Sequence, residues 1–173
     1  YASCEQASTG LGAEDTIFSG GTRMGDRLDH LFQEWHQLGG GVLLSEADTT
    51  LSARSPEEVI AESTIYCRES GRLTWVVLDW LIHNIEQIDE EKLIGETKSR
   101  GDLSVLGVLC DAAHQRKPHP KLGRLIASCR PNEKVETFFY RIARSPLASR
   151  LARENASDIF YRWNYLCSEL RYL

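Results

Sequence analysis

Apolar residues recur every three or four positions along most of the chain from residue 24 onward, and this spacing predicts α-helices. The clearest start signal is Ser55, which can cap a helix whose first residue is Pro56, while Glu58 can complete a capping box. The other predicted helices begin near Gly25, Leu73, Asp89, Asp102, Leu122, Asn132, Ser145 and Ser157. The apolar stripe of the helix from Asn132 continues to Ile142, and that of the last helix continues to Leu170. The sequence therefore predicts about eight helices and no convincing β-hairpin.

The segment from Leu73 to Ile88 is apolar on nearly every side. A helix of this kind belongs at the centre of a bundle. Trp, Val and Ile also favour strands, but sixteen residues without a turn signal favour a helix. We therefore expect an all-α fold, a single-domain bundle of about seven to nine helices with one fully apolar central helix.

Residues 1–23 stand apart, because they are rich in Gly, Ser, Thr and Ala and show little hydrophobic periodicity. This composition is typical of a flexible leader or a cloning remnant. The chain's only methionine, Met24, follows directly. The single helical domain is accordingly expected over residues 24–173.

The overall composition is that of an ordinary soluble globular protein, with 42% hydrophobic and 26% charged residues among 173. The apolar segment 73–88 is too short and too polar for a membrane span. No charged segment followed by an apolar one opens the chain, so a cytoplasmic protein without a membrane partner is expected. Its five cysteines form no C-x-x-C pair and are expected to be reduced, buried thiols.

Charge is distributed unevenly along the chain. Residues 1–99 carry 7 Lys/Arg against 18 Asp/Glu, a balance of −11, whereas residues 100–173 carry 13 against 7, a balance of +6. Between Arg116 and Arg153 there are ten basic residues, opposed only by Glu133 and Glu136. Such a block can attract a polyanion or the acidic face of another protein.

The basic block predicts a binding surface for an acidic partner, with nucleic acid as the favoured candidate. Two predicted helices flank the loop at Pro118 and Pro120 and form a weak match to a helix-turn-helix motif. The predicted contact residues are Arg116, Lys117, Lys121, Arg124, Arg141, Arg144, Arg150 and Arg153. The alternative is that these side chains pair with carboxylates of the acidic half, namely Glu57, Glu58, Glu62, Glu90 and Glu91.

The C-terminal segment is aromatic and cationic, and Tyr, Trp and Arg are enriched at protein interfaces. This composition predicts a second surface, for a protein complex or a homo-oligomer. Its candidate residues are Tyr161, Arg162, Tyr165 and Tyr172.

Signals for enzyme chemistry are weak. Asp79 and His83 are four residues apart on the predicted central helix, and a carboxylate beside an imidazole can orient a general base. No nucleophile can be assigned to them, and the sequence has no phosphate-binding loop, dinucleotide fingerprint or nucleophile elbow. Asp26, His30 and Glu34 share a helical face that should be solvated, so no metal or other cofactor is predicted.

The sequence thus favours a non-enzymatic regulatory or adaptor domain that binds an acidic partner through its basic C-terminal half. The first alternative is a protein-interaction subunit that uses its C-terminal aromatic helix. The second is an enzyme built on Asp79 and His83.

Overall fold

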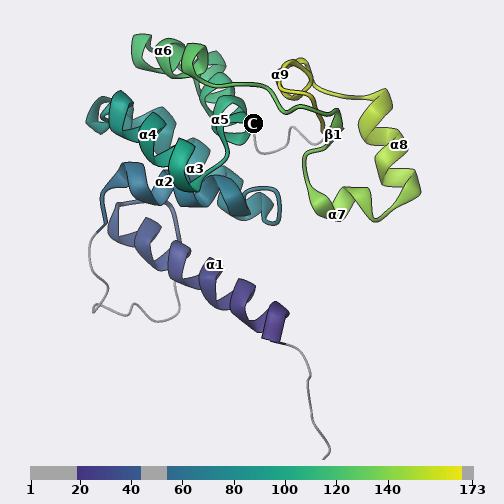
Figure 1. Cartoon of the computed structure of the whole chain (residues 1–173), viewed down its shortest axis with the longest axis horizontal. Helices are drawn as coiled ribbons and strands as arrows, with labels where there is room; N and C mark the ends of the chain where they lie inside the picture. The colour runs from purple at the N-terminus through teal and green to yellow at the C-terminus, as the bar shows by residue number, and fades with distance from the viewer. Residues whose placement is uncertain (1–18, 44–53, 169–173) are drawn as a thin grey trace, which may run out of the picture.

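The computed structural model describes residues 19–43 and 54–168. These residues form nine α-helices with almost no strand, which confirms the all-α prediction (Figure 1). The helices are α1 (Ser19–Gln37), α2 (Pro56–Tyr66), α3 (Gly71–Asn84), α4 (Glu90–Arg100), α5 (Leu103–Arg116), α6 (Pro120–Ser128), α7 (Tyr140–Ala143), α8 (Pro146–Glu154) and α9 (Asp158–Arg162). The remaining elements are a 3-10 turn (Ile85–Gln87) and two strands, β1 (Glu136–Thr137) and β2 (Tyr165–Leu166).

Helices α1 to α6 build the helical body, whose core is apolar and continuous. Within it α2 packs on α4, and α5 packs on both α3 and α6. The capping box predicted at Ser55 is present, since its hydroxyl accepts from the backbone N–H of Glu58 and the Glu58 carboxylate accepts from the backbone N–H of Ser55. Helix α1 joins the core through Trp35, whose Nε1 donates to the Ser63 hydroxyl at 3.0 Å.

The central helix differs in detail from the expectation. Helix α3 ends at Asn84, and it has a solvent-facing edge at Asp79 and His83. The more completely enclosed helix is α5, in which every residue of 104–113 is buried. Periodicity missed this because α5 is enclosed partly by α9 and the segment after it, which are distant in sequence.

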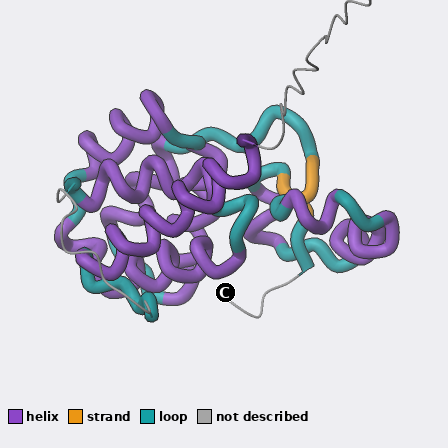
Figure 2. Tube along the Cα trace, turned by 90° about the horizontal axis from the view of Figure 1, so that it is seen from below, coloured by secondary structure: helices purple, strands orange, loops and turns teal. Residues whose placement is uncertain are grey.

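Helices α7 and α8 form a hairpin that projects from the body (Figure 1). We call residues 140–157 the hairpin. It has a small core of its own, in which Ile142 and Ala152 pack with Leu166 of β2. The two strands pair in parallel, with Glu136 opposite Tyr165 and Thr137 opposite Leu166. Figure 2 shows them between the helical body and the hairpin.

The helix predicted from Asn132 through Ile142 is wrong, because β1 and the short α7 occupy its second half. The buried Arg68 explains the difference: its Nε donates to the Phe138 carbonyl at 2.8 Å and its Nη2 to the Thr137 carbonyl at 2.9 Å. The backbone of this segment at β1 therefore forms its hydrogen bonds with Arg68 and with β2, and not with neighbouring residues as in a helix.

The C-terminal helix predicted to reach Leu170 is also shorter, since α9 ends at Arg162. Asn164 has a φ of 60°, the left-handed conformation that ends a helix and that Asn adopts more readily than most residues. The chain then extends into β2 beside β1.

Candidate functional site

The hairpin carries four arginines, Arg141, Arg144, Arg150 and Arg153, and a single acidic residue, Glu154. All four arginine residues are exposed. Among the described residues their only ion pair joins Arg150 to Glu154, and at 4.0 Å between two exposed side chains it contributes little. The hairpin therefore presents a surplus of cationic groups to solvent.

The local sequence explains why these arginines face outward. Ser145 caps α8 by accepting from the backbone N–H of Ala148, and Pro146 occupies the first helical position. Ala152 is buried and Ala148 half-buried on the inner side of the helix. Small residues on one face bring α8 close to α7 and leave the long side chains on the opposite side.

Two predicted contact residues are used by the body instead. Lys121 Nζ donates to the carbonyls of Glu86 and Ile88, each at 2.9 Å. Arg124 forms a bidentate pair with Glu90, and its hydrogen bonds lower the pKa of that carboxyl below its ordinary value. These two side chains therefore hold α6 against α4 and the turn before it, and the Arg124–Glu90 pair is one that the internal-pairing alternative expected.

The remaining predicted residues of the basic block lie near the end of α5. The Arg116 guanidinium is 5.8 Å from the centre of the Trp75 ring. Neither Arg116 nor Lys117 makes an ion pair in the described parts of the chain, and both are exposed. Four hairpin arginines and this pair remain available to a partner.

Some glutamates of the acidic half pair with arginines of the same half. Glu62 pairs with both Arg27 and Arg54, and Arg54 also binds the buried Glu34 at 2.5 and 2.6 Å. Hydrogen bonds from Arg54 to Glu34, the largest cause, raise the arginine pKa further above its ordinary value. The expectation of a solvated face at Glu34 is wrong, because a residue distant in sequence covers it.

Glu57 and Glu58 do not pair with the arginines of the second half, and their partners lie within the acidic half. Glu57 lies 3.8 Å from Lys92 and accepts from the backbone N–H of Asp89 at 2.9 Å. Glu58 serves the helix cap, where hydrogen bonds from Ser55 lower its pKa. These carboxylates therefore leave the hairpin arginines uncompensated.

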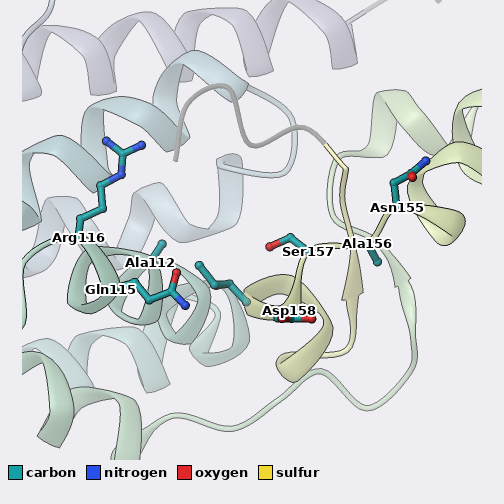
Figure 3. A pocket seen from close by; sticks show the side chains of 8 residues that line it. Ala112, Gln115, Arg116, Asn155, Ala156, Ser157 and Asp158 are labelled. Atoms are coloured by element: carbon teal, nitrogen blue, oxygen red, sulfur yellow. The ribbon is translucent and has the colours of Figure 1, made fainter.

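A cleft of about 450 Å³ lies between the end of α5 and the connection from α8 to α9. Its polar lining residues are Gln115, Arg116, Asn155, Ser157 and Asp158. In Figure 3, Arg116 and Asn155 lie at opposite ends of the view, and Gln115, Ser157 and Asp158 lie between them. Sequence reasoning identified Arg116 but missed the other four residues, because neutral polar side chains in loops carry no periodic signal.

The predicted protein-interface residues are in different environments. Tyr161 is 62% exposed, but Tyr165 is buried and its hydroxyl lies 2.6 Å from that of Ser104. Burial raises the pKa of Tyr165 to about 12. Arg162 makes a bidentate pair with Asp111, while Tyr172 lies outside the described residues. The four residues therefore do not form one open surface in the part of the chain that is described.

The predicted acid–base pair is on the surface of α3. His83 Nδ1 is 3.4 Å from the Asp79 carboxylate and 2.8 Å from the Asp79 carbonyl, and both side chains are open to solvent. Neither residue lines the cleft described above. Within residues 19–43 and 54–168, no group of three His, Cys, Asp or Glu side chains is placed to hold a metal ion.

Comparison with known proteins gives no relative: no family model, curated protein or solved structure matches this chain. None of the helices in the described ranges has both the length and the apolar character needed to cross a bilayer. A functional assignment therefore depends on the arrangement of the side chains themselves.

Proposed function

We propose that this protein is a non-enzymatic regulatory or adaptor domain that binds an acidic polymer, with nucleic acid as the first candidate, through the hairpin. The observation that carries the proposal is the exposure of Arg141, Arg144, Arg150 and Arg153 on a projecting element that contains one carboxylate. Arg116 and Lys117, across the cleft, extend the cationic surface.

The chemistry of arginine supports phosphate as the ligand group. A guanidinium offers several N–H donors in a planar fork that matches phosphate oxygens, and it keeps its charge at any physiological pH. Each phosphate that is neutralised releases condensed counterions, which makes the association favourable at low salt. A projecting hairpin can follow a backbone groove more easily than a flat surface can.

The proposal is tested by fluorescence anisotropy with labelled single-stranded and duplex oligonucleotides. The test variant is Arg141→Glu/Arg153→Glu, which reverses two hairpin charges. We expect its affinity to fall at least about tenfold, because two phosphate contacts become repulsive. The slope of log affinity against log salt should also become shallower by about 1.4 for a single strand, since each lost contact removes about 0.7.

The matched control is Lys98→Glu/Lys134→Glu, which makes the same change in net charge at exposed positions outside the hairpin. We expect this control to weaken binding less than the hairpin variant does. Equal losses in the two variants would mean that only overall charge matters. Absence of binding to any oligonucleotide at about 50 mM salt would overturn the nucleic-acid proposal, because electrostatic binding is strongest there.

A protein partner is the second candidate, and the outer face of α8 favours it. Leu147 and Leu151 are four residues apart and are 56% and 44% exposed. Exposed leucines beside arginines suit an acidic partner that also has apolar groups. Under this alternative, Leu147→Ser/Leu151→Ser should abolish a complex seen by size analysis while oligonucleotide affinity stays the same.

A further inference from the structure

We propose that the cleft between α5 and the α8–α9 connection receives one unpaired base of a nucleic-acid strand, so that the preferred ligand is single-stranded. This inference rests on the proposed function. It adds a base-binding site to the surface that binds phosphates.

The position of the cleft connects it to the cationic surface. One wall of the cleft is the end of α5 at Arg116. The other wall begins at Asn155, directly after α8, the helix that carries Arg150 and Arg153. A strand whose phosphates follow the hairpin therefore passes the mouth of the cleft. Phosphates on the opposite side of the cleft meet Arg116 and the neighbouring Lys117.

Several polar side chains of the cleft have no structural role in the described fold, unlike Ala112 and Ile159, which belong to the core. Gln115, Ser157 and Asp158 make no side-chain hydrogen bond or ion pair with any described residue, and Ser157 does not cap α9 with its hydroxyl. Asn155 donates its amide N–H to the Leu151 carbonyl at 3.1 Å, which leaves its own carbonyl oxygen as an acceptor. Gln115, Ser157 and Asp158 thus line one cleft without a side-chain partner in the described ranges, whereas Asn155 is partly used by the end of α8.

These groups match the chemistry of a nucleobase. The Gln115 amide both donates and accepts, and the Asp158 carboxylate accepts from base amino or imino groups. Half-buried Ala156 supplies an apolar contact for the ring, while Ala112 and Ile159 belong to the core behind the cleft. A volume of about 450 Å³ lies within the range of small-molecule sites.

This arrangement favours a single-stranded nucleic acid over a duplex. A base within a duplex has its Watson–Crick edge occupied by its partner, so it cannot also use that edge with Gln115 and Asp158. Proteins that read single strands combine a cationic surface for the backbone with pockets or rings for splayed bases. The hairpin and the cleft supply these two parts side by side (Figure 3).

The test compares two labelled oligomers of equal length, about twelve nucleotides, which is within the span of known single-strand sites. One is oligothymidylate, and the other has an abasic site at every position and therefore the same phosphate charge without bases. We expect the full chain to bind oligothymidylate about tenfold more tightly. The variant Gln115→Ala/Asp158→Ala should lose this preference and keep its affinity for the abasic oligomer.

The matched control is Gln37→Ala/Asp26→Ala, which removes the same two side-chain types from exposed positions of α1. It should keep the tenfold preference. Equal affinity of the unmodified chain for the two oligomers would overturn the cleft proposal and leave the proposed function standing. Binding to neither oligomer would overturn the cleft proposal, and absence of binding to a duplex as well would overturn the proposed function. A cleft variant that keeps its circular dichroism spectrum but loses affinity for both oligomers equally would also overturn the cleft proposal, because the loss would not depend on the base.

Discussion

Asp111 links the body to the C-terminal segment, because its carboxylate on α5 accepts hydrogen bonds from the last residue of α9 and from the residue after it. Arg162 donates to both of its oxygens, and Trp163 Nε1 donates to Oδ2 at 2.9 Å. Asp111 is buried, whereas the Arg162 side chain is 51% exposed. Removal of the carboxylate therefore leaves the arginine accessible to water and the indole N–H buried.

The first prediction concerns Asp111→Ala, which should lower the free energy of unfolding by about 2–3 kcal/mol. Hydrogen bonds to a charged group contribute about 1.5–3 kcal/mol, and solvation of Arg162 limits the loss. Urea unfolding followed by circular dichroism measures the change. Asp26→Ala, at an exposed position of α1, should change stability by less than about 0.5 kcal/mol. Similar midpoints for the two variants would contradict the role given to Asp111.

Individual charged residues show what the sequence can and cannot predict. The surplus of positive charge between Arg116 and Arg153 can be predicted from the sequence. Which of these side chains pair with a carboxylate and which remain open to solvent cannot. Arg124 and Arg153 are both exposed and in short amphipathic helices, yet only Arg124 has a carboxylate within reach. That difference comes from the packing of α4 against α6, which brings together residues more than thirty positions apart.

The cap of α2 gives the second prediction, which is a dependence on pH. Hydrogen bonds from the Ser55 backbone and hydroxyl hold the pKa of Glu58 below its ordinary value of 4.5. A carboxyl whose folded pKa is lowered stabilises the fold above its unfolded pKa and loses that contribution as pH falls through the folded pKa. Glu58→Gln should therefore reduce the loss of stability between neutral pH and about pH 3.

Urea unfolding at the two pH values measures this effect for the unmodified chain and for Glu58→Gln. Glu91→Gln is the matched control, since Glu91 is exposed in the first turn of α4 and has no resolved hydrogen bond among the described residues. Ser55→Ala should lower the free energy of unfolding by about 1 kcal/mol through loss of the cap. An unchanged acid dependence in Glu58→Gln would contradict the assignment.

Glycines in two helices give the third prediction, because replacing each by alanine should change the stability of the protein in opposite directions. A Cβ at Gly107 of α5 would lie 2.3 Å from the Trp163 ring, whereas one at Gly95 of α4 would meet nothing within 4 Å. Gly107→Ala should destabilise the protein by about 1–3 kcal/mol through overpacking. Gly95→Ala should stabilise it by about 0.5–1 kcal/mol, since alanine is the better helix former. Thermal unfolding of both variants is the measurement, and a shift of the same sign in both would contradict the packing of α5 against Trp163.

At the level of elements, prediction succeeded where local signals decide the structure. Ser55 and Pro56 mark the start of α2, and Ser145 and Pro146 mark the start of α8, through contacts within one turn. It failed at residues 132–142, where an apolar stripe at helical spacing became β1 and α7. The conformation of that segment is determined by hydrogen bonds from Arg68 and by the pairing of β1 with β2. Both contacts join residues about thirty to seventy positions apart.

At the scale of the whole molecule, the described residues form a large core and a small one, and the proposed binding surface lies on the hairpin, which has the small core. The hairpin core contains few buried residues and rests on the body mainly through Phe139 and β2. Regions with few buried apolar contacts open at lower free energy than the global core. We therefore expect the hairpin to open more readily than the helices of the body.

The fourth prediction is therefore a difference in hydrogen exchange between the two cores. Amides of α8 should exchange through local opening, at a free energy at least about 2 kcal/mol below that of the buried residues of α5. Exchange measured by NMR or mass spectrometry under native conditions gives both values. Binding of an oligonucleotide should slow exchange in α8, because a ligand that contacts the hairpin stabilises its closed form. If α8 and α5 exchange at the same free energy, the two cores unfold as one unit, and the hairpin would have to bind its partner as a rigid extension of the body.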